Sequence, residues 1–234
     1  MANQEQAGGI QVICSNSSRA VMDELLPAFE RASGHHVTIS YATAVQALSR
    51  IRDGATTDAI ILNAQSIDEL TKQGKIAADS RRELARCGVG IAVRAGAPKP
   101  DIGSVEAFKR ALLDAKSIAH TEAGASGIHF LGLIERLGIA AQVKAKTRTR
   151  PGGLIGELVA KGEAELAVQQ IPELMAVAGI DVVGPLPREL QSTTTVTAAV
   201  FAGARQPEAA RAFLAFLSTP AAARVFKARG LEPG

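Results

Sequence analysis

Hydroxyl, amide and glycine residues gather in five loops of this 234-residue chain, each at the start of a predicted helix. The loops are residues 15–18, 42–44, 121–127, 150–153 and 169–172. Helix N-termini offer backbone N–H groups without partners and a partial positive charge, so together they suit a small anion. Each loop taken alone is also an ordinary helix cap, a position that Ser, Thr and Asn often occupy. The pattern therefore predicts an anion site, with five ordinary caps as the alternative.

Titratable side chains flank the third of these loops. His120 and Glu122 lie near its start and His129 follows it. A histidine titrates near neutral pH, so it can remove and return a proton. The alternative for His129 is a partly buried helical residue whose hydrogen bonds are satisfied.

Three arginines stand where a guanidinium could bind a carboxylate through two hydrogen bonds. They are Arg19, Arg148 and Arg150, and each could equally be a solvated surface residue.

Several other functions lack their sequence signatures. The chain has no GxSxG, GxxxxGK[ST], GxGxxG or HExxH motif, so we expect no metal and no cofactor. Cys14 and Cys87 lie in apolar runs without ligand spacing and are expected in the core. The basic run at residues 144–150 indicates a strand edge more than a nucleic-acid patch, because the net charge is only +3. We therefore expect no nucleic-acid partner.

Strands and helices alternate along the whole chain. The apolar runs predict strands at residues 10–14, 37–41, 58–62, 88–94, 117–120, 165–169 and 193–202. Helical spacing predicts helices between them and two at the end, at residues 207–217 and 220–229. This alternation predicts an α/β fold with largely parallel strands, whose carboxyl ends are where such sheets bind ligands.

Three stretches carry a resemblance to a known family. They are residues 10–54, beginning IQVICSNSSRAV, then DAIIL at 58–62, and FLAFLSTPAAARVFKARG at 213–230. In order and spacing they resemble the molybdate-binding type of bacterial substrate-binding protein. The resemblance implies a two-lobed type II periplasmic-binding-protein fold, with mixed sheets flanked by helices and a ligand cleft between the lobes. The first lobe would comprise residues 1–85 and 195–234, and the second residues 86–194.

The resemblance also implies site residues. The family's oxyanion contacts fall on Ser17, Ala44 (beside Thr43), Ser126, the Gly152 N–H and Gln170. Ala44 and Gln170 stand where the family has a serine and a tyrosine, which disfavours molybdate itself. The function implied is that of a solute-binding protein for a small anion.

The alternative is an enzyme. The same family includes aconitate isomerase, which moves a double bond in a tricarboxylate through a 1,3-proton shift. On that reading His129, His120 and Glu122 would supply the acid and the base.

Partners and location follow from the same two readings. An exported binding protein would deliver its ligand to an ABC permease, and lobes of this size are expected to suffice as a monomer. The start MANQEQAGG has no signal-peptide pattern, which predicts a cytoplasmic protein as the sequence stands, or a periplasmic one if a signal was removed. A regulator's effector domain shares this fold but needs a helix-turn-helix, for which no residues remain.

Overall fold

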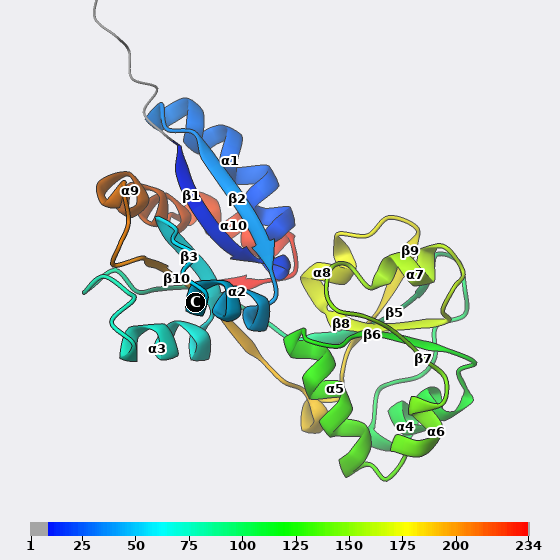
Figure 1. Cartoon of the computed structure of the whole chain (residues 1–234). Helices are drawn as coiled ribbons and strands as arrows, with labels where there is room; N and C mark the ends of the chain where they lie inside the picture. Colours follow the sequence, from blue (N-terminus) through cyan, green and yellow to red (C-terminus); the bar gives the residue numbers. More distant parts are fainter. Residues whose placement is uncertain (1–8, 234) are drawn as a thin grey trace, which may run out of the picture.

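The computed structural model describes residues 9–233 and shows two lobes side by side (Figure 1). Residues 1–8 and 234, which the predicted first lobe includes, lie outside the described residues. Each lobe is one β-sheet between two layers of helices. The strands are β1 (Ile10–Ser15), β2 (Val37–Ala42), β3 (Ala59–Asn63), β4 (Arg82–Cys87), β5 (Val89–Arg94), β6 (Ile118–Thr121), β7 (Thr147–Arg150), β8 (Leu166–Gln170), β9 (Ile180–Pro185), β10 (Thr194–Val200) and β11 (Glu232–Pro233).

The helices fill the connections between these strands. The α-helices are α1 (Arg19–Ser33), α2 (Ala44–Arg52), α3 (Ala64–Lys72), α4 (Val105–Asp114), α5 (Ala125–Arg136), α6 (Ala140–Lys144), α7 (Gly156–Ala160), α8 (Ile171–Met175), α9 (Pro207–Leu217) and α10 (Pro220–Ala228). Two short 3₁₀ helices complete them, η1 (Asn16–Ser18) and η2 (Arg188–Leu190).

The first lobe has the sheet order β11-β4-β10-β3-β1-β2. Its strands are apolar on both faces, so helices must cover both. Helices α1, α9 and α10 pack on one face through residues such as Phe29, Phe213 and Phe226. Helices α2 and α3 cover the other face with Ile51 and Ile67.

The second lobe repeats this plan with the sheet order β7-β6-β8-β5-β9. Helices α4, α5 and α6 pack on one face around the buried Phe108 and Phe130. The short helices α7 and α8 cover the other face with Leu158 and Leu174. Strand β7 lies at the sheet edge, where the basic run at residues 144–150 was expected.

Two chain segments cross between the lobes, and one side chain joins them. The first crossing passes from β4 to β5 through Gly88, and the second passes from β9 to β10. In the second, Gln191 accepts a hydrogen bond from Val89 N–H at 2.8 Å and donates one to the Val89 carbonyl at 3.0 Å. A Cβ at Gly88 would lie 2.9 Å from the Gln191 amide, so glycine leaves this contact the space it needs.

The strand directions test two expectations from the sequence, namely mixed sheets and largely parallel strands. Strands β2 and β3 run parallel to β1, and β7 and β8 run parallel to β6. Strands β10, β4 and β11 pair antiparallel in the first lobe, as do β5, β8 and β9 in the second. The α/β class and the mixed sheets are confirmed, and the expectation of largely parallel strands is wrong. Strand β4 was not expected, because the apolar pattern of its sequence RELARC is too weak to predict a strand.

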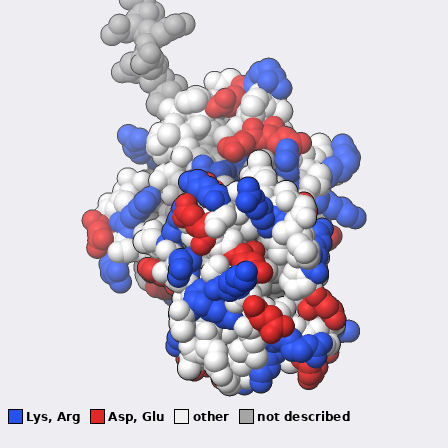
Figure 2. All heavy atoms as spheres, turned by 90° about the vertical axis from the view of Figure 1, so that its right-hand side faces the viewer, with Lys and Arg blue, Asp and Glu red and all other residues white. Residues whose placement is uncertain are grey.

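The outer surface carries both signs of charge. On the face seen in Figure 2, Lys and Arg side chains are interspersed with Asp and Glu. No helix among residues 9–233 has the length and apolar character needed to cross a membrane.

Candidate functional site

The inner cavity lies between the lobes, where strands of both sheets end. The space between its lining residues, open solvent included, amounts to about 450 Å³. Its lining residues are Ser15, Asn16, Ser17, Ala42, Thr43, Ala44, Asn63, Gly124, Ala125, Gln170, Glu173, Thr194 and Val196. Because β1, β2 and β3 are parallel, their carboxyl ends meet on one side of this space. From the second lobe, the residues after β6 and the end of β8 face it.

Helix N-caps converge on the inner cavity. Ser15, Thr43, Asn63, Gly124 and Gln170 are the N-caps of η1, α2, α3, α5 and α8, and all five line it. A helix start carries partial positive charge and N–H groups that the helix itself cannot pair. The cavity therefore offers an anion several helix starts at once.

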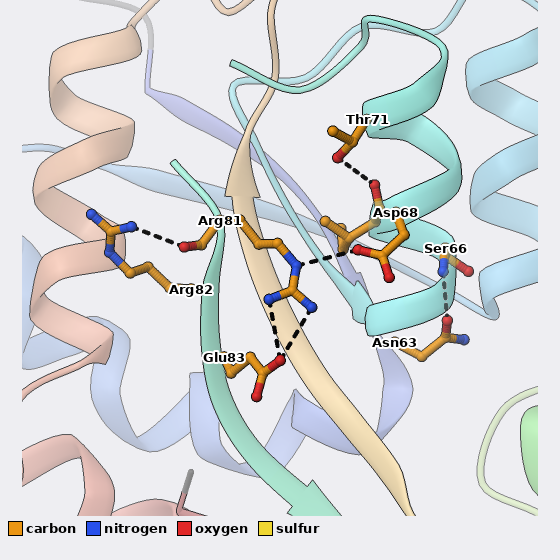
Figure 3. A network of polar contacts seen from close by, with 8 residues as sticks. Asn63, Ser66, Asp68, Thr71, Arg81, Arg82 and Glu83 are labelled. Atoms are coloured by element: carbon orange, nitrogen blue, oxygen red, sulfur yellow. Dashed lines mark hydrogen bonds and ion pairs between the residues drawn. The ribbon is translucent and has the colours of Figure 1, made fainter. Parts of the chain in front are cut away.

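The caps from the first lobe are held by their own hydrogen bonds. Thr43 accepts from Gln46 N–H at 3.2 Å while Gln46 accepts from Thr43 N–H at 3.0 Å, which is a capping box. Asn63 accepts from Ser66 N–H at 2.8 Å, as Figure 3 shows. That bond uses the amide oxygen, so the Asn63 NH₂ group keeps its donors for a ligand.

Helix α3 is fixed to the sheet beyond this cap. The Arg81 guanidinium lies between Asp68 of α3 and Glu83 of β4, at 3.3 and 3.1 Å (Figure 3). This network ties the helix that starts at the cavity to the strand that leads to the first crossing.

The second lobe brings its loop to the cavity through close backbone packing. A Cβ at Gly127 would lie 1.7 Å from the Thr121 carbonyl oxygen, so only glycine fits there. The start of α5 therefore folds tightly over the end of β6 and presents Gly124 and Ala125 to the cavity. Gln170 donates from Nε2 to Thr194 Oγ1 at 3.0 Å, which links β8 to the second crossing.

An outer cavity adjoins the inner one and shares Ala44, Asn63, Ala125 and Thr194 with it. The space between its lining residues, open solvent included, amounts to about 1180 Å³. Val45 and Ile128, which are 51% and 54% exposed, lie in its wall with Leu48. The inner cavity combines polar N-caps with apolar surface, and the outer cavity has polar residues such as Gln65, Ser66 and Thr193 beside these apolar ones.

The cleft carries little formal charge. Within residues 9–233, no Lys or Arg lines either cavity, and the titratable groups that do are Glu173, Glu69 and His129. Glu173 is only 9% exposed. Burial raises the pKa of Glu173 to about 8, although hydrogen bonding by the Gln170 backbone and the Gln169 side chain acts in the opposite direction.

The structure brings together most of the predicted ligand contacts. Ser17, Thr43, Ala44 and Gln170 all line the inner cavity. Ser126 follows the lining residue Ala125 in the chain but does not itself line the cavity, and it is 2% exposed.

Gly152 lines neither cavity. Its site in the second lobe faces Thr43 of the first, since a Cβ there would lie 3.0 Å from Thr43 Cγ2.

Of the predicted acid–base residues, only His129 lines the cleft. Its Nε2 lies 2.8 Å from the Leu190 carbonyl oxygen. His120 is buried, with its ring 5.3 Å from that of Phe130 and its Nδ1 at 3.0 Å from the Thr121 carbonyl oxygen. Glu122 is exposed and accepts a hydrogen bond from Thr149 Oγ1 at 2.7 Å.

The three candidate arginines are placed elsewhere. The Arg19 guanidinium stacks on the Tyr41 ring at 3.7 Å. Arg150 pairs with Glu157 at 3.0 Å, and Arg148 is exposed.

Sequence reasoning did not single out Glu173 or Asn63. Both carried a signal, because each marks a helix start: Asn63 at the N-cap of α3, and Glu173 as the third residue after the Gln170 cap. A cap position does not tell which cavity it faces, and that is decided by how the sheets pack.

The comparisons with known proteins agree with this arrangement. A family model described as bacterial extracellular solute-binding protein matches residues 10–232. A Pseudomonas protein named aconitate isomerase is 36% identical over 230 residues, covering 96% of this chain and 87% of that protein. A molybdate-binding protein of Azotobacter vinelandii is 28% identical over 239 residues, covering 96% and 90%.

Solved structures show the same fold. The periplasmic molybdate-binding protein of Azotobacter vinelandii superimposes with a TM-score of 0.80 at 19% identity, covering 95% of this chain and 98% of that one. The sulfate-binding protein of Mycobacterium tuberculosis gives 0.77 at 19%, covering 96% and 86%. The two-lobed type II fold expected from the sequence is confirmed.

Proposed function

Because the chain belongs to the family of bacterial extracellular solute-binding proteins, we propose that its cleft captures a small organic acid in anionic form. The observation that carries this proposal is the convergence of five helix N-caps on one inner cavity. Backbone N–H groups, the Asn63 amide and the Ser17 and Thr43 hydroxyls would bind one carboxylate there.

The outer cavity favours an organic acid over a bare oxyanion. A tetrahedral oxyanion would occupy the inner cavity alone, and Ala44 and Gln170 reduce the hydroxyl donors available to it. An organic acid would extend past Ala44 towards Val45 and Ile128, whose side chains suit a carbon skeleton. The site residues proposed are Ser17, Thr43, Asn63 and Gln170, with Ser126 and Gly152 as neighbours of the wall.

A second candidate function is isomerisation of such an acid, favoured by the 36% identity to a protein named aconitate isomerase. A 1,3-proton shift requires a group that removes a proton from one carbon and a group that returns one two carbons away. His129 and Glu173 are titratable residues that line the cleft. If the protein is instead a transport component, a permease would be its partner.

The test is a thermal-shift screen of the protein against molybdate, tungstate, sulfate, phosphate, cis-aconitate, trans-aconitate and other di- and tricarboxylates. A ligand that binds only the folded state raises the unfolding midpoint. We expect a shift with a carboxylate, and absorbance of the same mixture reports whether the acid is converted. A shift with molybdate or tungstate and none with carboxylates would contradict the proposed ligand class.

A further inference from the structure

Glu173 is the acidic side chain in the wall of the inner cavity. It is the third residue of α8, 9% exposed, and lines the space together with Gln170, Ser17 and Thr194. None of the ion pairs formed within residues 9–233 includes it. A buried carboxyl group that forms no ion pair and belongs to the wall of the proposed anion site calls for an explanation.

An ionised Glu173 would oppose the proposed ligand. Two negative charges in one desolvated cavity repel each other strongly, because water does not screen them. A neutral carboxyl group has the opposite effect, since its O–H is a hydrogen-bond donor. The same side chain thus either repels the anion or binds it, depending on one proton.

We propose that Glu173 binds the anion as a neutral carboxylic acid that donates its O–H to a ligand oxygen, so that ligand capture is coupled to protonation of this residue. This inference rests on the proposed function, since it concerns the anion held in the inner cavity. Burial supports it, because it raises the pKa of Glu173 to about 8 and keeps the group mostly protonated at pH 7.

The titratable and charged groups packed around Glu173 do not compete with it for the proton. The Cys87 thiol is the titratable neighbour across the first crossing, and burial raises its pKa to about 12, so it stays neutral. Strand β8 and η1 contribute no charged side chain against α8. At the far ends of β5 and β9, Arg94 is exposed and Asp181 accepts from Gly96 N–H at 3.1 Å.

The remaining charged groups are engaged elsewhere or lie further out. Gly230 lies against Met175 and Ile171 of α8, and its neighbour Arg229 forms an ion pair with Glu24. Arg19, which follows η1, stacks on Tyr41. His129 and Glu69 line the outer cavity.

The test measures the dissociation constant of trans-aconitate, and of molybdate in parallel, between pH 6.5 and 9.5. Carboxylic acids lose their protons below about pH 7, so between pH 7 and pH 9.5 the ligand adds no titration of its own. Deprotonation of Glu173 removes the binding form, so we expect the dissociation constant to rise roughly tenfold between pH 7 and pH 9. At pH 8.5, calorimetry in two buffers of different ionisation enthalpy should show roughly three quarters of a proton taken up per ligand bound.

Variants separate Glu173 from other sources of pH dependence. Glu173→Gln keeps a donor and loses the titration, so its dissociation constant should stay constant above pH 7. Glu163→Gln makes the same change at an exposed position of the second lobe and should keep the wild-type pH dependence. His129→Asn should also keep the rise above pH 7.5.

The outcomes distinguish this inference from the proposed function. Binding that is independent of pH, or tighter at high pH, would overturn the role of Glu173 and leave anion capture intact. A pH dependence that persists in Glu173→Gln would overturn it too. If no anion binds at any pH, the proposed function fails and this inference falls with it.

Discussion

At the residue scale, Asn63 and Glu173 show how side chains at helix starts serve the cavity and the fold together. Asn63 caps α3 with its oxygen, which leaves its NH₂ donors free, and the residue lines the inner cavity. Glu173 stands one turn into α8 and brings a carboxyl group to the same space. Changing the charge of either residue while keeping its shape tests the cavity without removing the cap.

Asn63→Asp should weaken anion binding with little effect on folding. Asp caps a helix about as well as Asn, so the unfolding midpoint without ligand should change little. The new carboxylate would face the bound anion, and we expect at least a roughly tenfold higher dissociation constant by calorimetry. Gln142→Glu, at an exposed position of α6, adds the same charge away from the cleft and serves as control. Equal affinity in both variants would contradict the assigned cavity.

Glu173→Gln should stabilise the protein at alkaline pH. In the folded state the pKa of Glu173 is raised from 4.5 to about 8. The wild type therefore keeps its full stability below pH 4.5 and loses part of it as pH rises through about 8, because the unfolded chain releases the proton more easily. At about 1.4 kcal/mol per pH unit, the difference reaches roughly 4–5 kcal/mol. Chemical unfolding at pH 5 and pH 8.5 measures it, and equal gains at both pH values would contradict the cause.

At the scale of the elements, the two crossing segments hold the lobes in register. Each crossing leaves the sheet of one lobe and enters that of the other, so backbone groups between the sheets need other partners. Gln191 supplies them for Val89, and Gly88 gives it room. A side chain thus continues the strand pairing across the joint between the lobes.

Gln191→Ala should destabilise the protein. It leaves the N–H of Val89 without its partner, at a cost of about 1–3 kcal/mol for a buried group, while the Val89 carbonyl still accepts from Leu186 N–H. Urea unfolding measures the loss. Gln142→Ala, an exposed change on α6, should stay within about 0.5 kcal/mol of wild type. If Gln191→Ala also lowered the free energy of unfolding by no more than about 0.5 kcal/mol, water would be replacing the hydrogen bonds of the side chain.

At the scale of the whole molecule, residues of the two lobes touch at two places. Gly152 of the second lobe meets Thr43 of the first, and Met175 of α8 lies against Gly230 beyond α10. The proposed ligand contacts come from both lobes, so we expect binding to require this approach. Closure about the crossings is the motion expected to bring them together.

Gly152→Leu should hold the lobes apart. Its side chain would meet Thr43 at the point where a Cβ already lies 3.0 Å from Cγ2. We expect at least a roughly tenfold loss of ligand affinity with a nearly unchanged unfolding midpoint, because the wedge opposes closure and not folding. Small-angle scattering should show a larger radius of gyration when ligand is present. Gly132→Leu is the control, since a Cβ there meets only the end of the Arg136 side chain.

Most of the elements and their order could be predicted from the sequence. Apolar runs and glycine stops located most strands and helices, since these depend on neighbours along the chain. Hydroxyl and amide residues before the helices indicated the N-cap positions, because a cap also depends on neighbours along the chain. The strand RELARC was missed because its position in the sheet depends on its partner β10 and not on its own pattern.

Tertiary structure alone decided which caps share a cavity. Asn63 and Glu173 are more than 100 residues apart in the chain, and only the packing of the lobes places both on one space. His120 and Glu122 flank the same loop as His129, yet His120 lies in the inner strand β6 and is buried against Phe130, whereas Glu122 follows the end of that strand and is exposed. Local sequence sets which groups a loop contains, and the contacts between distant segments set where they point.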